Sequence, residues 1–157
     1  MALSKSEIKT AYPLPTYNYR VEIAGVAIGF SEVSGLSISR ETTTYKESPT
    51  ASGVVGPVVM NMPSQRGGAS VSLKKGLVKT TSVATLYSWI NSIQLNQVEK
   101  KDIYVRLCDE SGNAVISWKV VNAFPKKLDA PSFSASSNDA AIESMELMAD
   151  AIFIEET

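Results

Sequence analysis

The stretch SNDAAIESMELMADAIFIEE, residues 137–156, decides the fold because it is compatible with two local structures. As a helix, it would place on one stripe the acidic residues Asp139, Glu143, Glu146 and Asp150. As a strand, it would place on one face the residues Met145, Leu147, Ala149, Ala151 and Phe153. The other face would then mix acidic and apolar side chains, namely Ile142, Glu146, Met148, Asp150 and Ile152. Its Ala, Glu, Met and Leu residues favour a helix, so the local pattern alone leaves both structures open.

The composition is that of one folded domain, and it excludes several classes of protein. The chain has 157 residues, of which 44% are hydrophobic and 20% charged, so it can bury a core of its own. Fifteen basic and sixteen acidic residues give a net charge of −1, and no basic run indicates nucleic-acid binding. No apolar run is long enough to span a membrane, and the N-terminus lacks the apolar stretch of a signal peptide. We therefore expect synthesis and assembly in the cytoplasm.

Residues that carry catalysis are scarce. The sequence has no histidine and a single cysteine, Cys108, which excludes an imidazole base, an intrachain disulfide and a multi-cysteine metal site. Cys108 lies in the alternating run IYVRLCDE and is predicted to be a small core or interface residue. Two carboxylate pairs, Asp109 with Glu110 and Glu143 with Glu146, are the only candidates for acid–base chemistry, and nothing else converges on them. We predict no enzyme activity, no cofactor and no metal.

Alternating apolar residues predict a β-rich domain. Residues 17–23 alternate cleanly, and residues 36–45 and 69–73 follow the same pattern. Residues 101–107 and 114–121 alternate around a turn cluster at 109–113, which predicts a hairpin. Two prolines, Pro125 and Pro131, are expected to bracket a loop before the C-terminal stretch.

One helix is predicted, over about residues 82–95. Five apolar residues recur there at helical spacing, namely Val83, Leu86, Tyr87, Ile90 and Ile93. Ser82 is a plausible N-cap, and Trp89 is expected to pack beside the stripe. The fold class is thus mainly β with one helix (α+β), a curled antiparallel β-sheet or β-barrel with the helix packed on it.

The segment 46–68 is the least regular part of the chain. It contains three prolines, several glycines and the apolar run VVGPVVMNM. A structureless stretch of this length is unusual and commonly functional, and exposed apolar side chains indicate a contact surface. The alternative is that the segment folds over the protein's own core.

Five blocks of sequence resemble one protein family. They are YPLPTYNYRVEIAG (12–25), FSEVSGLSISRETTTYKES (30–48), MPSQRGG (62–68), LYSWINSIQLNQVEKKDIYVRL (86–107) and SWKVVNAFPKKLDAPSFSASSNDAAIESMEL (117–147). In this order they resemble the phage-tail-tube family, and among its members the inner tube protein of extracellular contractile injection systems of the antifeeding-prophage and virulence-cassette type. The blocks WINSIQLNQVEKKDI and NAFP followed by PSF are the specific ones. The segment 49–60 is longer than the resemblance leads us to expect.

The resemblance implies a structural subunit rather than an enzyme. Six copies would form a ring of continuous β-structure, and rings would stack into a hollow tube inside a contractile sheath. The implied partners are further copies of the chain, the sheath protein, baseplate or spike proteins, tube-terminating proteins and cargo proteins in the lumen. A contractile phage tail tube or a type VI secretion tube is the alternative. The family's C-terminal stretch is a strand, so residues 140–154 are expected to be one despite their helical pattern.

The resemblance also implies a domain organisation for the chain. Residues 1–157 would be a single tail-tube domain, with an N-terminal extension at 1–15 and a long irregular contact loop at 46–68. We predict that this loop and the strand end before it supply contacts between subunits or stacked rings. The candidate contact residues are Tyr45, Val54, Val55, Val58, Val59, Met60, Met62, Pro63 and Arg66.

Overall fold

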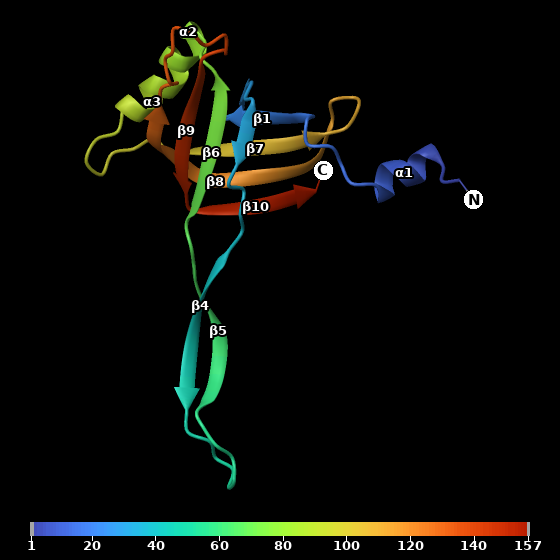
Figure 1. The fold of residues 1–157 in the computed structure, drawn as a ribbon, viewed down its shortest axis with the longest axis vertical. Helices are drawn as coiled ribbons and strands as arrows, with labels where there is room; N and C mark the ends of the chain where they lie inside the picture. Colours follow the sequence, from blue (N-terminus) through green and yellow to red (C-terminus); the bar gives the residue numbers. More distant parts are fainter. Residues whose placement is uncertain (1, 157) are drawn as a thin grey trace.

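A computed structural model describes residues 2–156, and eight of its strands form one bent antiparallel sheet. Its strands run in the order β2-β1-β7-β8-β9-β6-β3, and β10 also pairs with β8. Strands β4 and β5 form a separate two-stranded sheet that extends away from this body (Figure 1). The strands are β1 Tyr19–Ile23, β2 Val26–Ile28, β3 Glu32–Ser34, β4 Arg40–Glu47, β5 Val58–Arg66, β6 Ala69–Gly76, β7 Lys101–Cys108, β8 Ala114–Asp129, β9 Ile142–Ala149 and β10 Ala151–Glu156.

The longest strand, β8, bends the sheet. Its first part pairs with β7 on one side and β10 on the other, and its last part pairs with β9. Asn122 lies between the two parts with a positive φ of 53°, a conformation that asparagine tolerates better than most residues. Pro125 was expected to begin a loop, but it lies inside β8, where the register against β9 shifts, as proline in a strand requires. The bent sheet does not close into a barrel.

The C-terminal stretch forms two strands, which confirms the strand prediction and excludes the helix. β9 pairs with β6 on one side and with β8 on the other. The side chains on its inner face fill the core, and their burial outweighs the local preference for a helix. Met145, Leu147, Ala149 and Ala151 are buried as the alternation predicts. Strand structure is interrupted at Asp150, between β9 and β10. Beyond it the alternation shifts, so that Ile152 is buried and Phe153 is 42% exposed. The prediction that Phe153 shares the inner face was wrong.

The helix lies on the sheet, but its limits and its inner face differ from the prediction. It consists of α2 (Lys79–Thr81), the π-helical segment η1 (Ser82–Tyr87) and α3 (Ser88–Asn91), so it ends before residue 95. Its buried residues are Ser82, Leu86 and Trp89, whereas Val83 and Tyr87 are more than half exposed. These buried residues recur at i, i+4 and i+7, which is α-helical spacing, so the inner face is rotated toward Ser82 and Trp89 relative to the predicted stripe. Ser82 is therefore an inward-facing helical residue and not the N-cap, which is Val78.

Buried polar side chains join this helix to the sheet. The Ser82 hydroxyl donates to Glu143 Oε1 at 2.5 Å, and it accepts from the backbone N–H of Val78. Lys75 Nζ lies 3.9 Å from Glu143 Oε1 and donates to the carbonyl of Gly76. Because Lys75, Ser82 and Glu143 are all about 5% exposed or less, the cluster fixes the helix against β6 and β9 without direct competition from water.

A glycine after β3 allows the chain to pass close to β6. Gly35 has φ 85°, and a Cβ built on it would lie 2.5 Å from the carbonyl oxygen of Ser70. We expect Gly35→Ala to destabilise the subunit by about 1 kcal/mol from backbone strain and about 1–3 kcal/mol more from the clash. Gly25→Ala is the control because Gly25 has φ 83° but nothing within 4 Å of its Cβ. Thermal unfolding should separate the two variants by several degrees; equal midpoints would show that the clash relaxes without cost.

Candidate assembly surfaces

The hairpin of β4 and β5 projects from the body and contributes nothing to its core (Figure 1). Every residue of β4 is exposed, and in β5 only Val58 is half-buried. The sequence prediction of an irregular segment at 46–68 was wrong in part, because residues 58–66 form a strand paired with β4. Only the tip, between Glu47 and Val58, and the root at residues 67–68 lack strand structure.

Strand pairing divides the hairpin into an apolar and a polar face. Tyr45 lies opposite Met60, and Glu47 lies opposite Val58. Directly opposite residues of an antiparallel pair share a face, so one face carries the apolar residues Tyr45, Val58, Met60 and Met62, with Thr43 and Glu47 at its two ends. The other face carries Thr42, Thr44, Lys46, Val59, Asn61 and Pro63, and Thr44 donates a 2.9 Å hydrogen bond to Asn61 on it.

The structure brings together four of the nine predicted contact residues and separates the others. Tyr45 is 50% exposed, Met60 39% and Met62 42%, and they form one continuous apolar stripe with Val58. Val54 and Val55 lie in the tip, where Val55 is 94% exposed. Val59 and Pro63 belong to the opposite face, and Arg66 lies at the root of the hairpin, beside the body.

An isolated two-stranded hairpin is at best marginally stable in water. This one has an apolar face with no covering element among the described residues, so its own packing does not explain its order. Such a patch is typical of a protein–protein contact. The hairpin is therefore the strongest candidate for an assembly surface.

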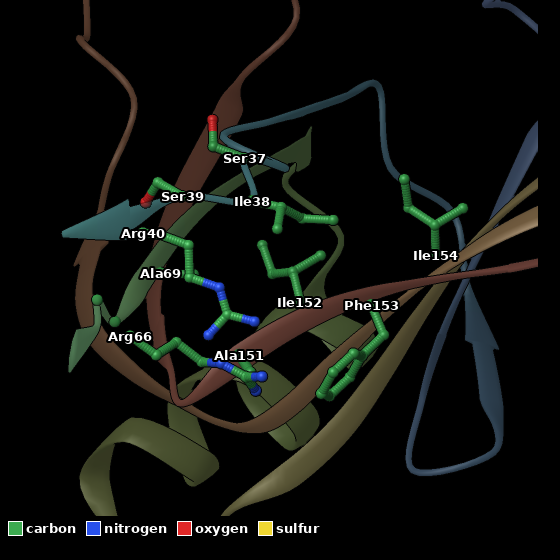
Figure 2. A pocket seen from close by; sticks show the side chains of 12 residues that line it. Ser37, Ile38, Ser39, Arg40, Arg66, Ala69, Ala151, Ile152, Phe153 and Ile154 are labelled. Atoms are coloured by element: carbon green, nitrogen blue, oxygen red, sulfur yellow. The ribbon is translucent and has the colours of Figure 1, made fainter. Parts of the chain in front are cut away.

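A small cavity lies where the hairpin meets the body (Figure 2). It has a volume of about 140 Å³. Its walls come from the root of the hairpin, from β6 and from β10, and they include Arg40, Arg66 and Phe153. The guanidinium carbon of Arg66 lies 5.3 Å from the centre of the Phe153 ring, a cation–π distance.

A second arm projects from the N-terminal extension. Helix α1 (Lys5–Ala11) begins with a capping box between Ser4 and Glu7 and has no buried residue. The S-x-x-E spacing at residues 4–7 is a sequence signal for the start of this helix, which was not predicted. Apolar side chains of the arm are exposed, among them Leu3, Tyr12 and Tyr17.

Ion pairs hold α1 to the turn after β7. Lys9 Nζ lies 2.8 Å from Glu110 Oε1 and 3.9 Å from Asp109 Oδ2. The hydrogen bond from Lys9 lowers the pKa of Glu110 below its usual value, and the same bond raises the pKa of Lys9. The pKa of Asp109 is lowered by hydrogen bonds from the backbone N–H groups of Asn113 and Ser111. The carboxylates of Asp109 and Glu110, which were weighed as candidates for acid–base chemistry, thus take part in a turn and in the contact with α1.

The sheet also leaves strand edges open. Within residues 2–156, β2 pairs only with β1, β3 only with β6 and β10 only with β8. An unpaired edge exposes N–H and C=O groups that can pair with another chain. The open edges are a second kind of surface suited to assembly.

Neither a cluster of metal-ligating residues nor a membrane-spanning helix is found in the described part of the chain. It contains no group of three or more His, Cys, Asp or Glu residues placed to hold a metal ion. None of its helices has the length and hydropathy needed to cross a bilayer. Cys108 is buried, as the sequence predicted.

Comparisons with known proteins agree on one family. The sequence matches the family of the T4-like virus tail tube protein gp19 over residues 15–152. No curated protein sequence gives a match. The structure resembles a chain of the PVC sheath-tube complex, an extracellular contractile injection system in its extended state, at 39% identity and TM-score 0.88, covering 99% of this chain and 100% of that chain. It also resembles a chain of the PVC sheath/tube terminator, at 41% identity and TM-score 0.81, with 92% and 97% covered.

Two further structures extend this comparison. A chain of the anti-feeding prophage tube terminating cap is 38% identical, with TM-score 0.84, and 100% of this chain and 95% of that chain are covered. Hcp1 from Flavobacterium johnsoniae is 20% identical with TM-score 0.53, covering 90% of this chain and 97% of that one. The likeness to Hcp1 is one of fold alone.

Proposed function

This chain belongs to the family of the T4-like virus tail tube protein, and from that membership we propose that six copies close into a ring and that rings stack into a hollow tube. It is a tail tube subunit of the kind found in extracellular contractile injection systems, since its solved relatives at 38–41% identity come from such particles. The fold predicted from the resemblance is confirmed by these matches.

The observation that carries the proposal is the projecting hairpin with its uncovered apolar face. A second copy of the chain is the partner that a tube supplies at every position along its length. We assign the stripe of Tyr45, Val58, Met60 and Met62 to the contact between stacked rings. Burial of these side chains would stabilise both the hairpin and the stack.

The open strand edges support closure within a ring. A head-to-tail contact joins two different surfaces of identical subunits, and it closes when the rotation between subunits divides a full turn. Six subunits is the number implied by the family resemblance. A more distant relative, at 17% identity, comes from an anti-feeding prophage baseplate solved with sixfold symmetry, which agrees with that number.

The proposed partners follow from where the relatives lie. Those relatives come from sheath–tube, terminator, cap and baseplate assemblies, so we assign a contractile sheath, a baseplate and a terminator as neighbours of this tube. Cargo proteins would travel in the lumen. The subunit acts as a wall and not as a catalyst, and we place its synthesis in the cytoplasm before assembly into the particle.

A contractile phage tail tube or a type VI secretion tube is the alternative, with the same fold but a different launch site. The identity of 38–41% to extracellular systems, against 20% to Hcp1, favours the extracellular particle.

Immunogold electron microscopy of particles from the cells that carry the gene tests the proposal. An antibody to this chain should label the rods that emerge from contracted sheaths. Genes for sheath, baseplate and an AAA ATPase should lie beside it. Labelling confined to particles with capsids, or neighbouring genes for capsid and terminase, would contradict the extracellular assignment.

A further inference from the structure

Two arginines face each other at the root of the hairpin without an acidic partner. Arg40 on β4 and Arg66 on β5 are directly opposite in the strand register. Like charges at such positions repel each other and destabilise the pairing. Neither side chain forms a salt bridge with any acidic residue among residues 2–156. Glu41 lies beside Gly67 at the same root, and it too forms no salt bridge with them.

The two guanidinium groups share one cavity. Figure 2 shows both of them in the cavity at the root, with that of Arg66 beside the Phe153 ring. The remaining lining comes from small and apolar residues and two serines, so no acidic group forms part of the wall. A volume of about 140 Å³ is room for several water molecules or for a carboxylate. A carboxylate is the group that arginine binds best, through two parallel N–H···O bonds.

Strand β10 carries suitable carboxylates at its other end. Its first four residues, Ala151 to Ile154, line the cavity, and Glu155 and Glu156 follow them beyond the wall. Glu155 and Glu156 are exposed and form no salt bridge within the described chain. Figure 1 shows β10 along the edge of the body, running from the hairpin root toward the side from which α1 projects.

A head-to-tail ring contact joins two different patches of identical subunits, and these two patches are opposite in charge. We propose that the cavity between Arg40 and Arg66 is the seat for one carboxylate from the end of β10, that of Glu155 or Glu156, of the next subunit of the same ring. The inference rests on the ring of the proposed function and names one of its contacts. It explains why two arginines lie opposite each other at the root, because a carboxylate of the neighbouring subunit between them would offset their repulsion.

Charge reversal tests the pairing. Arg66→Glu alone, or Glu155→Lys with Glu156→Lys, places like charges in contact and should raise the subunit concentration for half-maximal ring formation by about tenfold or more. A chain with Arg40→Glu, Arg66→Glu, Glu155→Lys and Glu156→Lys should recover ring formation because both patches are reversed. Lys126→Glu is the matched control, since Lys126 is exposed, has no salt bridge and lies outside the cavity. Sedimentation velocity measures the rings, and circular dichroism verifies that each variant is folded.

The outcomes separate this inference from the proposed function. Rings of wild-type protein with no effect of either reversal would overturn the assignment of this contact and leave the ring intact. Wild-type protein that forms no rings would overturn the proposed function itself. A reversal that weakens rings no more than Lys126→Glu does would also contradict the pairing.

Cross-linking keeps the test independent of folding defects. In a Cys108→Ala chain, Ser39→Cys in the cavity wall and Glu156→Cys at the far end of β10 should form disulfides between neighbouring subunits. The expected product on a non-reducing gel is a ladder that stops at six subunits. A ladder that continues beyond six would place the contact between stacked rings, and the absence of any cross-link in assembled rings would contradict it outright.

Discussion

Replacing Met60 by aspartate is expected to leave the subunit folded and to abolish stacking of its rings. Met60 lies in the middle of the apolar stripe, opposite Tyr45, and it is 39% exposed in the single subunit. In a stack, the substitution removes about 2 kcal/mol of apolar burial and adds the larger cost of covering an unpaired carboxylate. A loss above about 3 kcal/mol weakens each contact more than a hundredfold. Because the contact repeats around every ring, electron microscopy should show single rings without tubes.

The control for Met60→Asp introduces the same charge on the polar face. Asn61→Asp keeps the oxygen that accepts the hydrogen bond from Thr44, so it should preserve the hairpin. Tubes of Asn61→Asp should therefore resemble those of the wild type. Loss of tubes in both variants would contradict the division of the hairpin into two faces, and normal tubes of Met60→Asp would remove the hairpin from the stacking contact.

Replacing Glu143 by alanine is expected to produce the largest loss of stability in the single subunit. The change leaves the Lys75 ammonium and the Ser82 hydroxyl buried without their shared carboxylate. Breaking a buried pair in this way costs about 3–5 kcal/mol. For a chain of this size, the thermal midpoint should fall by about 10 °C. The measurement belongs at concentrations too low for assembly, because association would raise the midpoint.

A double variant distinguishes loss of the ion pair from loss of packing. Lys75→Met with Glu143→Leu replaces both charges by apolar side chains of similar size, and such replacements of buried pairs are commonly neutral or stabilising. The double variant should recover most of the lost stability. A double variant as unstable as Glu143→Ala would show that the helix depends on the shape of the Glu143 side chain and not on its charge.

The C-terminal strands show how far local sequence determines this fold. Residues 142–149 have helical propensity, yet they form a strand because β6 and β8 offer a slot on both sides and Met145 and Leu147 fill the core. The local pattern was compatible with both a helix and a strand. The strand was predicted only because the whole chain resembles tube proteins. The interruption between β9 and β10 at Asp150 could not be predicted, because the alternation of residues in the sequence continues through it.

The hairpin is the part of the candidate assembly surface that the sequence predicted least well. Prolines and glycines at 49–57 indicated an irregular segment, but the flanking residues pair as strands. A hairpin with no buried face gives no core pattern from which its strands can be recognised. The apolar run was nevertheless correctly singled out as unusual, and Tyr45, Met60 and Met62 proved to share one exposed stripe.

The arginine cavity could not be inferred from the sequence. Arg40 and Arg66 are separated by 25 intervening positions and lie opposite each other only because β4 and β5 pair in this register. Arg66 was predicted as a contact residue from its place beside the apolar run, whereas Arg40 was missed. The pair became visible only once the register was known.

Native mass spectrometry of the purified chain at micromolar concentration tests most directly whether the subunit is completed by copies of itself. Species of six times 16.9 kDa and stacked multiples of that mass are expected. A chain that remains a 16.9 kDa monomer throughout the concentration range would contradict that expectation.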